Sequence, residues 1–146
     1  MNSKLNTVKT KLLIIPCSKI KRPVINTSAL KLYDGPFFRM IRKYNPDDFD
    51  ILILSAKYGM IQSNSVISCY DQKMTEEQAK KLSCLINGNL TQFLVDKEYE
   101  NVYINLGKIY FKALEPSMNL FKDVNVHFAS GGIGMRLQQL KKWISG

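Results

Sequence analysis

Two carboxylates in this sequence occupy positions from which they could act on a bound ligand. Asp71 follows an extended segment, residues 67–70, and precedes a long predicted helix that already has Thr75 as its cap. Asp34 precedes another predicted helix and is also explained as the N-cap of that helix. A carboxylate beside a ligand can orient a water molecule or stabilise an oxocarbenium ion. We therefore take Asp71 as the first catalytic candidate and Asp34 as the second.

Hydroxyl, amide, thiol and cationic side chains follow the short apolar runs of the chain. Lys57 comes after the second run and either pairs with an anionic ligand or carboxylate or is simply solvated, and we include it among the catalytic candidates. Asn105 ends the third run, where its amide could read the edge of a base, although a satisfied structural amide explains it equally well. The candidate substrate-binding residues are Cys17, Ser18, Tyr58, Tyr70 and Asn105.

A glycine-rich turn over residues 130–134 connects the fourth apolar run to the last predicted helix. Its backbone N–H groups and the helix dipole could hold a phosphate. It matches neither the dinucleotide fingerprint nor a Walker motif, and a plain tight turn is the alternative. The candidate phosphate-binding residues are Lys19, Lys21, Ser130, Gly131 and Gly132.

Cysteine and histidine chemistry is less favoured. The single histidine, His127, lies within the fourth apolar run, which argues against a catalytic pair with Cys17. The 3 cysteines show no CxxC or Cys/His spacing, so we expect free thiols in a reducing compartment and no metal site. No cofactor is expected.

Four apolar runs, interleaved with amphipathic segments, supply the elements that must position these side chains. The runs 12–16, 51–55, 102–106 and 124–129 are typical of strands, and the segments 36–44, 75–95, 108–114 and 135–144 show helical periodicity. We expect Asn87-Gly88-Asn89 to break or kink the second of these helices.

The alternation of strands and helices predicts the fold. It favours an α/β protein, a three-layer α/β/α sandwich with a four-stranded, mostly parallel sheet. Residues 12–146 form one domain, preceded by a basic tail over residues 1–11. Ligands bind beyond the carboxyl ends of the strands in such sheets, near the switch point, so the candidates above should converge there.

The charge of the chain is uneven. Its 21 basic and 12 acidic residues give a net charge of +9, and no acid lies in residues 1–33 or 124–146. This excess at both ends predicts attraction to a polyanion, with a merely solvated basic surface as the alternative. The hydrophobic content of 45% excludes wholesale disorder.

Neither export nor membrane insertion is predicted. The apolar run near the N-terminus is about five residues long, whereas a signal-peptide core needs roughly 7–15. No stretch approaches the roughly 18 apolar residues of a membrane span. We expect a cytoplasmic protein without a membrane partner.

Five sequence blocks carry a resemblance to a known family. They are PCSKIK (16–21), LYDGPFF (32–38), ILSAKYGMI (53–61), ISCYD (67–71) and GGIGMRL (131–137). Together they resemble a small family of uncharacterised bacterial and phage proteins, over about residues 12–144. Cys69 stands where the family pattern usually has proline, which should alter the turn before Asp71.

Two further resemblances suggest a substrate. The first block is similar to the core of archaeosine synthase, which acts on a deazaguanine base in transfer RNA. The predicted four-strand layout is more distantly similar to the uracil-DNA glycosylase superfamily, which implies a uracil-DNA-glycosylase-like fold. The GQDPYH and HPSP blocks of uracil-specific enzymes are absent, so uracil itself is not the expected base.

The leading hypothesis is therefore a DNA glycosylase that removes a modified base, as in antiviral defence, and its partner is DNA rather than RNA. Asp71 or Asp34 would position water, Tyr58 or Tyr70 would stack on an everted base, and Ser18 with the glycine turn would hold a phosphate. One alternative is a transferase that modifies deazaguanine in transfer RNA, for which Lys57 or Lys19 would matter more. Another is a nucleic-acid- or nucleotide-binding protein without turnover, which would not need Asp71.

Overall fold

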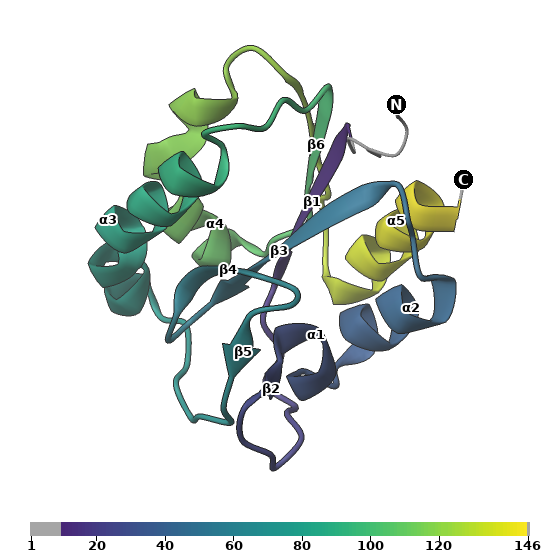
Figure 1. The fold of residues 1–146 in the computed structure, drawn as a ribbon, viewed down its shortest axis with the longest axis vertical. Helices are drawn as coiled ribbons and strands as arrows, with labels where there is room; N and C mark the ends of the chain where they lie inside the picture. Colours follow the sequence, from purple (N-terminus) through teal and green to yellow (C-terminus); the bar gives the residue numbers. More distant parts are fainter. Residues whose placement is uncertain (1–9, 146) are drawn as a thin grey trace.

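A five-stranded, mostly parallel sheet lies at the centre of the protein (Figure 1). The structure is a computed structural model and describes residues 10–145, so residues 1–9 of the predicted basic tail lie outside it. The strands, in spatial order, are β4 (Gly59–Gln62), β3 (Phe49–Ser55), β1 (Lys11–Pro16), β6 (Asn101–Ile104) and β7 (Asn125–Phe128). All neighbours are parallel except β4, which pairs antiparallel with β3.

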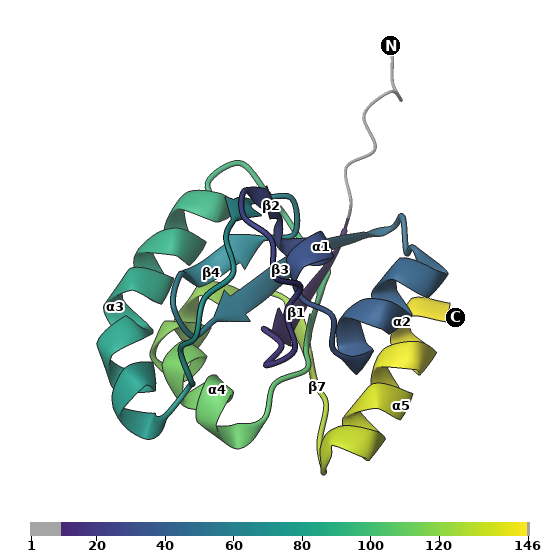
Figure 2. The same cartoon turned by 90° about the horizontal axis from the view of Figure 1, so that it is seen from below.

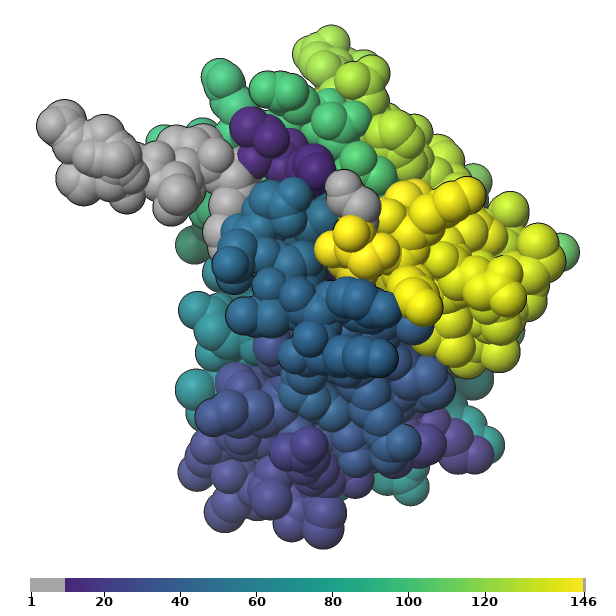
Figure 3. Space-filling view, turned by 90° about the vertical axis from the view of Figure 1, so that its right-hand side faces the viewer, coloured from purple at the N-terminus to yellow at the C-terminus, as the bar shows by residue number. Residues whose placement is uncertain are grey.

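Helices cover both faces of the sheet, which confirms an α/β fold with helical layers on either side (Figures 1 and 2). One layer contains α3 (Glu76–Phe93), α4 (Lys108–Leu114) and the 3-10 helix η2 (Glu115–Phe121). The other contains α1 (Ala29–Leu32), α2 (Pro36–Tyr44) and α5 (Ile133–Ser145). Figure 3 shows α2 in blue and α5 in yellow lying side by side on the outside of this second layer. A two-stranded antiparallel ribbon joins β2 (Thr27–Ser28) to β5 (Val66–Ile67).

The central strand β1 explains why its sequence is apolar without interruption. Leu12 and Ile14 pack towards α3 and α4, whereas Leu13 and Ile15 pack towards α2 and α5, and all four are fully buried. Successive side chains of a strand point to opposite faces, so a strand covered on both sides must be apolar at every position. The two layers therefore have separate cores on opposite faces of the sheet, and Met74 and Tyr110 pack against both.

Two expectations about the elements need correction. The sheet has a fifth strand, β4, because the chain reverses after β3 at Gly59, whose φ of 80° suits glycine. The expected break at residues 87–89 does not occur, since α3 runs without interruption to Phe93. Two of these residues instead bind neighbouring segments: Asn89 Oδ1 accepts a hydrogen bond from the backbone of Met60, and Asn87 donates to Ser117 Oγ.

The order of the parallel strands creates a switch point beside β1. The chain passes from β1 to β3 on one side and then crosses to β6 on the other side of β1. The connections that leave β1 and β6 therefore diverge at their carboxyl ends, where open α/β sheets bind ligands. The candidate residues are therefore expected at the carboxyl ends of β1 and β6.

Candidate functional site

Two neighbouring hollows open where β1 ends. The first, of about 390 Å³, has Lys21, Cys69, Tyr70, Asp71 and Lys73 in its wall, and we call it the tyrosine hollow. The second, of about 330 Å³, has Phe37, Phe38, Ile133 and Arg136 in its wall, and we call it the arginine hollow. Four side chains line both, namely Cys17, Ser18, Lys19 and Tyr110. Both volumes fall in the range of roughly 300–1,000 Å³ typical of small-molecule sites.

The loop after β1 forms the boundary between the hollows and is held in place from several sides. The backbone N–H of Cys17 donates to Leu54 of β3 at 2.9 Å, and its Sγ lies 3.3 Å from the hydroxyl of Tyr110. Ser18 Oγ accepts from the N–H of Ile20 at 3.0 Å. A side chain at Gly35 would overlap Ser18 Oγ, so a larger residue there would displace the Ser18 side chain. Cys17 and Ser18, both predicted ligand-binding residues, thus have fixed positions.

A network of hydroxyl groups supports the back of the tyrosine hollow. Ser55, fully buried at the end of β3, accepts from the backbone N–H groups of Lys57 and Tyr58 and hydrogen-bonds Tyr70 at 2.9 Å. The hydroxyl of Tyr70 also lies 2.6 Å from that of Tyr33. Burial raises the pKa of Tyr33 and of Tyr70 above the ordinary value of a phenol, so both stay neutral.

The rings of Tyr58 and Tyr70 pack against each other. They meet edge to face with centroids 5.4 Å apart. Lys21 Nζ lies 4.4 Å from the Tyr70 ring centre, and Lys57 Nζ lies 5.8 Å from it. With Lys19 and Lys73 in the wall, several cations gather around one aromatic group. The predicted residues Lys19, Lys21 and Tyr70 therefore line one hollow, whereas Lys57 and Tyr58 lie beside Tyr70 but line neither hollow.

Asp71 is the one acidic side chain that lines either hollow among the residues the structure describes. It lies between β5 and α3, next to Tyr70 in the chain, and its side chain is exposed. The helix behind it is capped by Thr75, whose hydroxyl accepts from the N–H of Gln78 at 3.0 Å. The α3 N-terminus therefore does not require the carboxylate of Asp71, as the sequence suggested.

Asp34, the second catalytic candidate, lines neither hollow and has a structural role. Its carboxylate lies 2.7 Å from Arg42, 3.4 Å from Arg39 and 3.8 Å from Arg22. Hydrogen bonding from Arg39, reinforced by the charges of Arg39 and Arg22 and a bond from Arg42, holds the pKa of Asp34 below its ordinary value, against the opposing effect of burial. The N-cap interpretation also fails, because Gly35 is the cap of α2 and Asp34 makes no capping bond.

Asn105 is fully buried beneath the edge of the sheet and does not line the hollows. Its amide nitrogen donates to the backbone carbonyl of Arg136 at 2.9 Å, which ties the end of β6 to the first turn of α5. Its Oδ1 has no hydrogen-bond partner among the described residues. The structure thus gives Asn105 a role in joining two elements.

Of the glycine turn, Ile133 lines the arginine hollow, but the predicted phosphate-binding residues do not. The backbone of Ser130 is bonded at both its N–H and its carbonyl by the side chain of Gln139, at 3.0 and 2.8 Å. Gly131 has a φ of 89°, and a side chain there would overlap Met135. Ser130, Gly131 and Gly132 line neither hollow, so the structure does not place the predicted phosphate-binding turn with the lysines.

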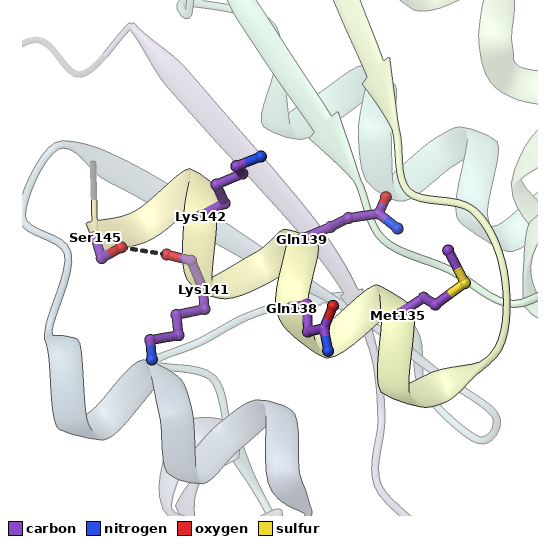
Figure 4. Close-up of a pocket in the computed structure, with 6 residues that line it drawn as sticks. All are labelled: Met135, Gln138, Gln139, Lys141, Lys142 and Ser145. Carbon is purple, nitrogen blue, oxygen red and sulfur yellow. Dashed lines mark hydrogen bonds between the residues drawn. The ribbon is translucent and has the colours of Figure 1, made fainter.

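A third hollow, of about 430 Å³, lies on the outer face of α5 and is not a comparable site. All of its lining residues come from this one helix (Figure 4): Met135, Gln138, Gln139, Lys141, Lys142 and Ser145. Their side chains point in different directions, and the hydroxyl of Ser145 donates to the helix's own Lys141 carbonyl at 2.6 Å. Polar groups from different elements do not converge there.

Tyr110, Arg136 and Lys73 are among the lining residues that sequence reasoning missed. Tyr110 and Arg136 both lie in the first turns of helices that follow parallel strands, α4 and α5. Lys73 lies two residues beyond Asp71. The rule that ligands meet the carboxyl ends of strands could have found the first two if it had been extended from the loops to the following helical turns.

Several other features concern the described residues as a whole. No group of three or more His, Cys, Asp and Glu side chains among residues 10–145 is arranged to hold a metal ion. Cys17, Cys69 and Cys84 are free thiols. No helix in this part of the chain is long and apolar enough to cross a membrane.

Comparisons with known proteins place the fold and the family. The crystal structure of AF0587, a protein of unknown function, is similar with a TM-score of 0.56 and 14% sequence identity. The match covers 94% of this chain but 45% of that one, so this chain spans less than half the length of its structural neighbour. At this identity the likeness concerns the fold alone. A comparison of the sequence with curated proteins found no match. Residues 12–142 match a family of unknown function, DUF6884, and the chain belongs to this family.

Proposed function

We propose that this protein is a nucleic-acid-acting N-glycosidase, a DNA glycosylase that releases a modified base. The observation that carries the proposal is the composition of the tyrosine hollow, in which a single carboxylate, Asp71, faces a space walled by Tyr70 and Tyr110 and bordered by lysines. An aromatic wall suits a base, cations suit phosphates, and a carboxylate suits the sugar between them.

The reaction places a distinct demand on each part of this hollow. The bond between C1′ and the base nitrogen breaks, its electrons leave with the base, and positive charge develops on the sugar. The Asp71 carboxylate stabilises that charge and accepts a proton as the oxygen of water bonds to C1′. The departing base takes up a proton from solvent. Lys21 and Lys73 hold the phosphates, which keeps the sugar beside Asp71.

The neutral state of the tyrosines also fits this assignment. Tyr33, Tyr70 and Tyr110 all have pKa values raised by burial, so none adds a negative charge near the ligand. Cys17 Sγ is hydrogen-bonded by Tyr110, and the single histidine lies away from it in β7, where it bonds Asn101 at 2.9 Å. A cysteine–histidine pair is therefore not formed, which favours a carboxylate mechanism over a thiol mechanism.

The preference for a modified base in DNA rests on the family resemblance and on the lysines. The PCSKIK block, which resembles the core of a base-acting enzyme, includes Cys17 and Ser18, and both residues line the tyrosine hollow. Everting a base costs a few kcal/mol, and a bulky substituent lowers that cost or is read directly. Antiviral defence against phage with modified DNA is the setting that such an activity implies.

The test is an abasic-site assay with the full chain. Oligonucleotides that contain unmodified, 5-hydroxymethylated and glucosylated cytosine are incubated with the protein and then cleaved with alkali, with a transfer RNA as a parallel substrate. We expect abasic sites only in modified DNA. If no modified substrate yields abasic sites, and Asp71→Ala leaves defence against phage with modified DNA intact, the proposal is wrong.

A matched pair of variants shows whether the tyrosine hollow is responsible. Asp71→Asn removes the carboxylate charge and keeps the shape of the side chain, whereas Asp123→Asn makes the same change at an exposed position before β7, outside both hollows. We expect abasic-site formation to be lost in the first variant and retained in the second.

A further inference from the structure

The arginine hollow contains a half-buried arginine, Arg136. Arg136 projects from the first turn of α5 into the wall of this hollow. Its Nε and Nη1 atoms are buried and have no hydrogen-bond partner, and no carboxylate of the described residues forms an ion pair with it. Since Nε and Nη1 are enclosed, Nη2 is the nitrogen left to face the hollow. A half-buried guanidinium without a counter-charge is costly, and an oxyanion in the hollow that accepts hydrogen bonds from Nη2 would supply one.

The surroundings of Arg136 would strengthen such a contact. The guanidinium carbon lies over the Phe37 ring, 5.6 Å from its centre, so the cation faces an aromatic ring. Phe37 and Phe38 are almost completely buried, and Ile20 and Ile133 stand at the rim. An ion pair gains strength in surroundings of low dielectric constant, and a guanidinium N–H donates a strong, charge-assisted hydrogen bond to phosphate or carboxylate oxygens.

The position of the arginine hollow relates it to the tyrosine hollow. Lys19 lines both, as do Cys17, Ser18 and Tyr110, so one ligand can extend from one hollow into the other. A nucleotide has the required chemistry, with a planar base for the aromatic side and a phosphate for the arginine side. Lys19, at the boundary, adds a second cation for the phosphate.

We propose that the arginine hollow is an oxyanion-binding subsite in which Arg136 holds the phosphate of the nucleotide whose base occupies the tyrosine hollow. This proposal deepens the proposed function and rests on it for the identity of the ligand. It gives a binding role to Arg136, which lies in the GGIGMRL block and in the acid-free segment 124–146 but was not among the candidate site residues. It also predicts that a nucleotide binds better than a nucleoside because the phosphate of the nucleotide contacts Arg136.

The direct test observes Arg136 in the unmodified full chain. The Nε–Hε group is followed by NMR during titration with thymidine 5′-monophosphate, thymidine, inorganic phosphate and benzoate. We expect a saturable shift with the nucleotide, little change with thymidine, and weaker binding of inorganic phosphate than of the nucleotide. Absence of a nucleotide-induced shift overturns the proposal. A shift with benzoate but not with the nucleotide also overturns it, because the subsite then serves a carboxylate ligand.

Variants provide an independent readout. Arg136→Gln should weaken nucleotide binding roughly 10- to 100-fold, as the loss of a charged hydrogen bond does, and Arg136→Lys should weaken it less. Lys142→Gln, on the exposed side of α5, is the control of equal charge change and should bind normally. Equal nucleotide binding by a folded Arg136→Gln variant overturns the proposal, and the NMR titration decides if that variant does not fold.

The binding experiment separates this proposal from the proposed function. Nucleotide binding that depends on Arg136, without base release from any DNA, would refute the glycosidase and leave the subsite standing. Base release that is unaffected by Arg136→Gln, together with an unperturbed Nε–Hε resonance, would refute the subsite and leave the glycosidase standing.

Discussion

Asp34 and Asp71 each lie shortly before a helix, but the fold gives them opposite surroundings. Asp34 precedes the cap of α2 and is held by Arg22, Arg39 and Arg42. Asp71 precedes the cap of α3 and borders the tyrosine hollow beside Tyr70. A carboxylate bound by three guanidinium groups has its charge and its oxygens already used, whereas an exposed carboxylate in a hollow can meet a ligand. Position before a helix therefore says less about function than the charges that surround the side chain.

The largest difference should appear in catalysis. We expect Asp71→Asn to slow base release by at least about 100-fold, because a positioned acid or base contributes roughly 10²–10⁴ in rate. Asp34→Asn should leave the rate per folded molecule within about twofold. Single-turnover kinetics on modified DNA measure both. Equal losses in the two variants would remove the distinction between the carboxylates.

The hydroxyl network behind Tyr70 should have the next largest effect. Ser55→Ala leaves the N–H groups of Lys57 and Tyr58 without their acceptor and removes one partner of Tyr70. We expect the free energy of unfolding to fall by about 1–3 kcal/mol, as the loss of a buried hydrogen-bonding group does. Ser83→Ala on α3, whose hydroxyl donates to Lys80, is the control. Urea unfolding curves that coincide for the two variants would contradict the structural role of Ser55.

Asp34 should show its role in stability through pH. Its pKa is held down in the folded protein, so its ionised form stabilises the fold above the ordinary range of an aspartate, and this stabilisation disappears as the pH falls through the folded pKa. Asp34→Asn should therefore lower the melting temperature at pH 7, and the difference from the unmodified chain should shrink below about pH 4. A difference that stays constant down to pH 2 would contradict the arginine pairing.

The smallest expected effect concerns the salt dependence of DNA binding. If Lys21 contacts a phosphate, Lys21→Gln should reduce the slope of log affinity against log salt by about one. Lys122→Gln, an exposed residue outside both hollows, should leave the slope unchanged. Fluorescence anisotropy with labelled DNA over a salt series measures this slope, and equal slopes for the two variants would place the DNA elsewhere.

Much of the fold could be predicted because it depends on local pattern. The four parallel strands and the helices between them follow from apolar runs and helical periodicity. The strand β4 was missed because it has only four residues, Gly59–Gln62, and forms a hairpin with β3 through a turn that contains Lys57 and Tyr58. The continuity of α3 was missed because Asn87 and Asn89 bind other segments, which sequence periodicity does not reveal.

The candidate site could be predicted in part for the same reason. Cys17, Ser18, Lys19 and Lys21 lie near β1's carboxyl end, and Asp71 precedes a helix that has its own cap, so position alone indicated them. The role of Asp34 depends on its ion pairs with Arg22, which belongs to a separate loop, and with Arg39 and Arg42 of α2. The backbone N–H and carbonyl of Ser130 are already hydrogen-bonded by the side chain of Gln139. Such pairings arise only when the chain is folded, so spacing could not distinguish these residues from true ligand contacts.

The most direct measurement is the identification of the product by mass spectrometry. The full chain and Asp71→Asn are incubated with DNA that carries a glucosylated cytosine, and the small molecules released are analysed. We predict that the protein without substitutions releases the intact modified base and leaves an abasic sugar in the DNA strand. The Asp71→Asn variant should release none. Release of a nucleotide, incorporation of a free base, or equal base release by Asp71→Asn would contradict the assignment of Asp71 and the tyrosine hollow as an N-glycosidase site.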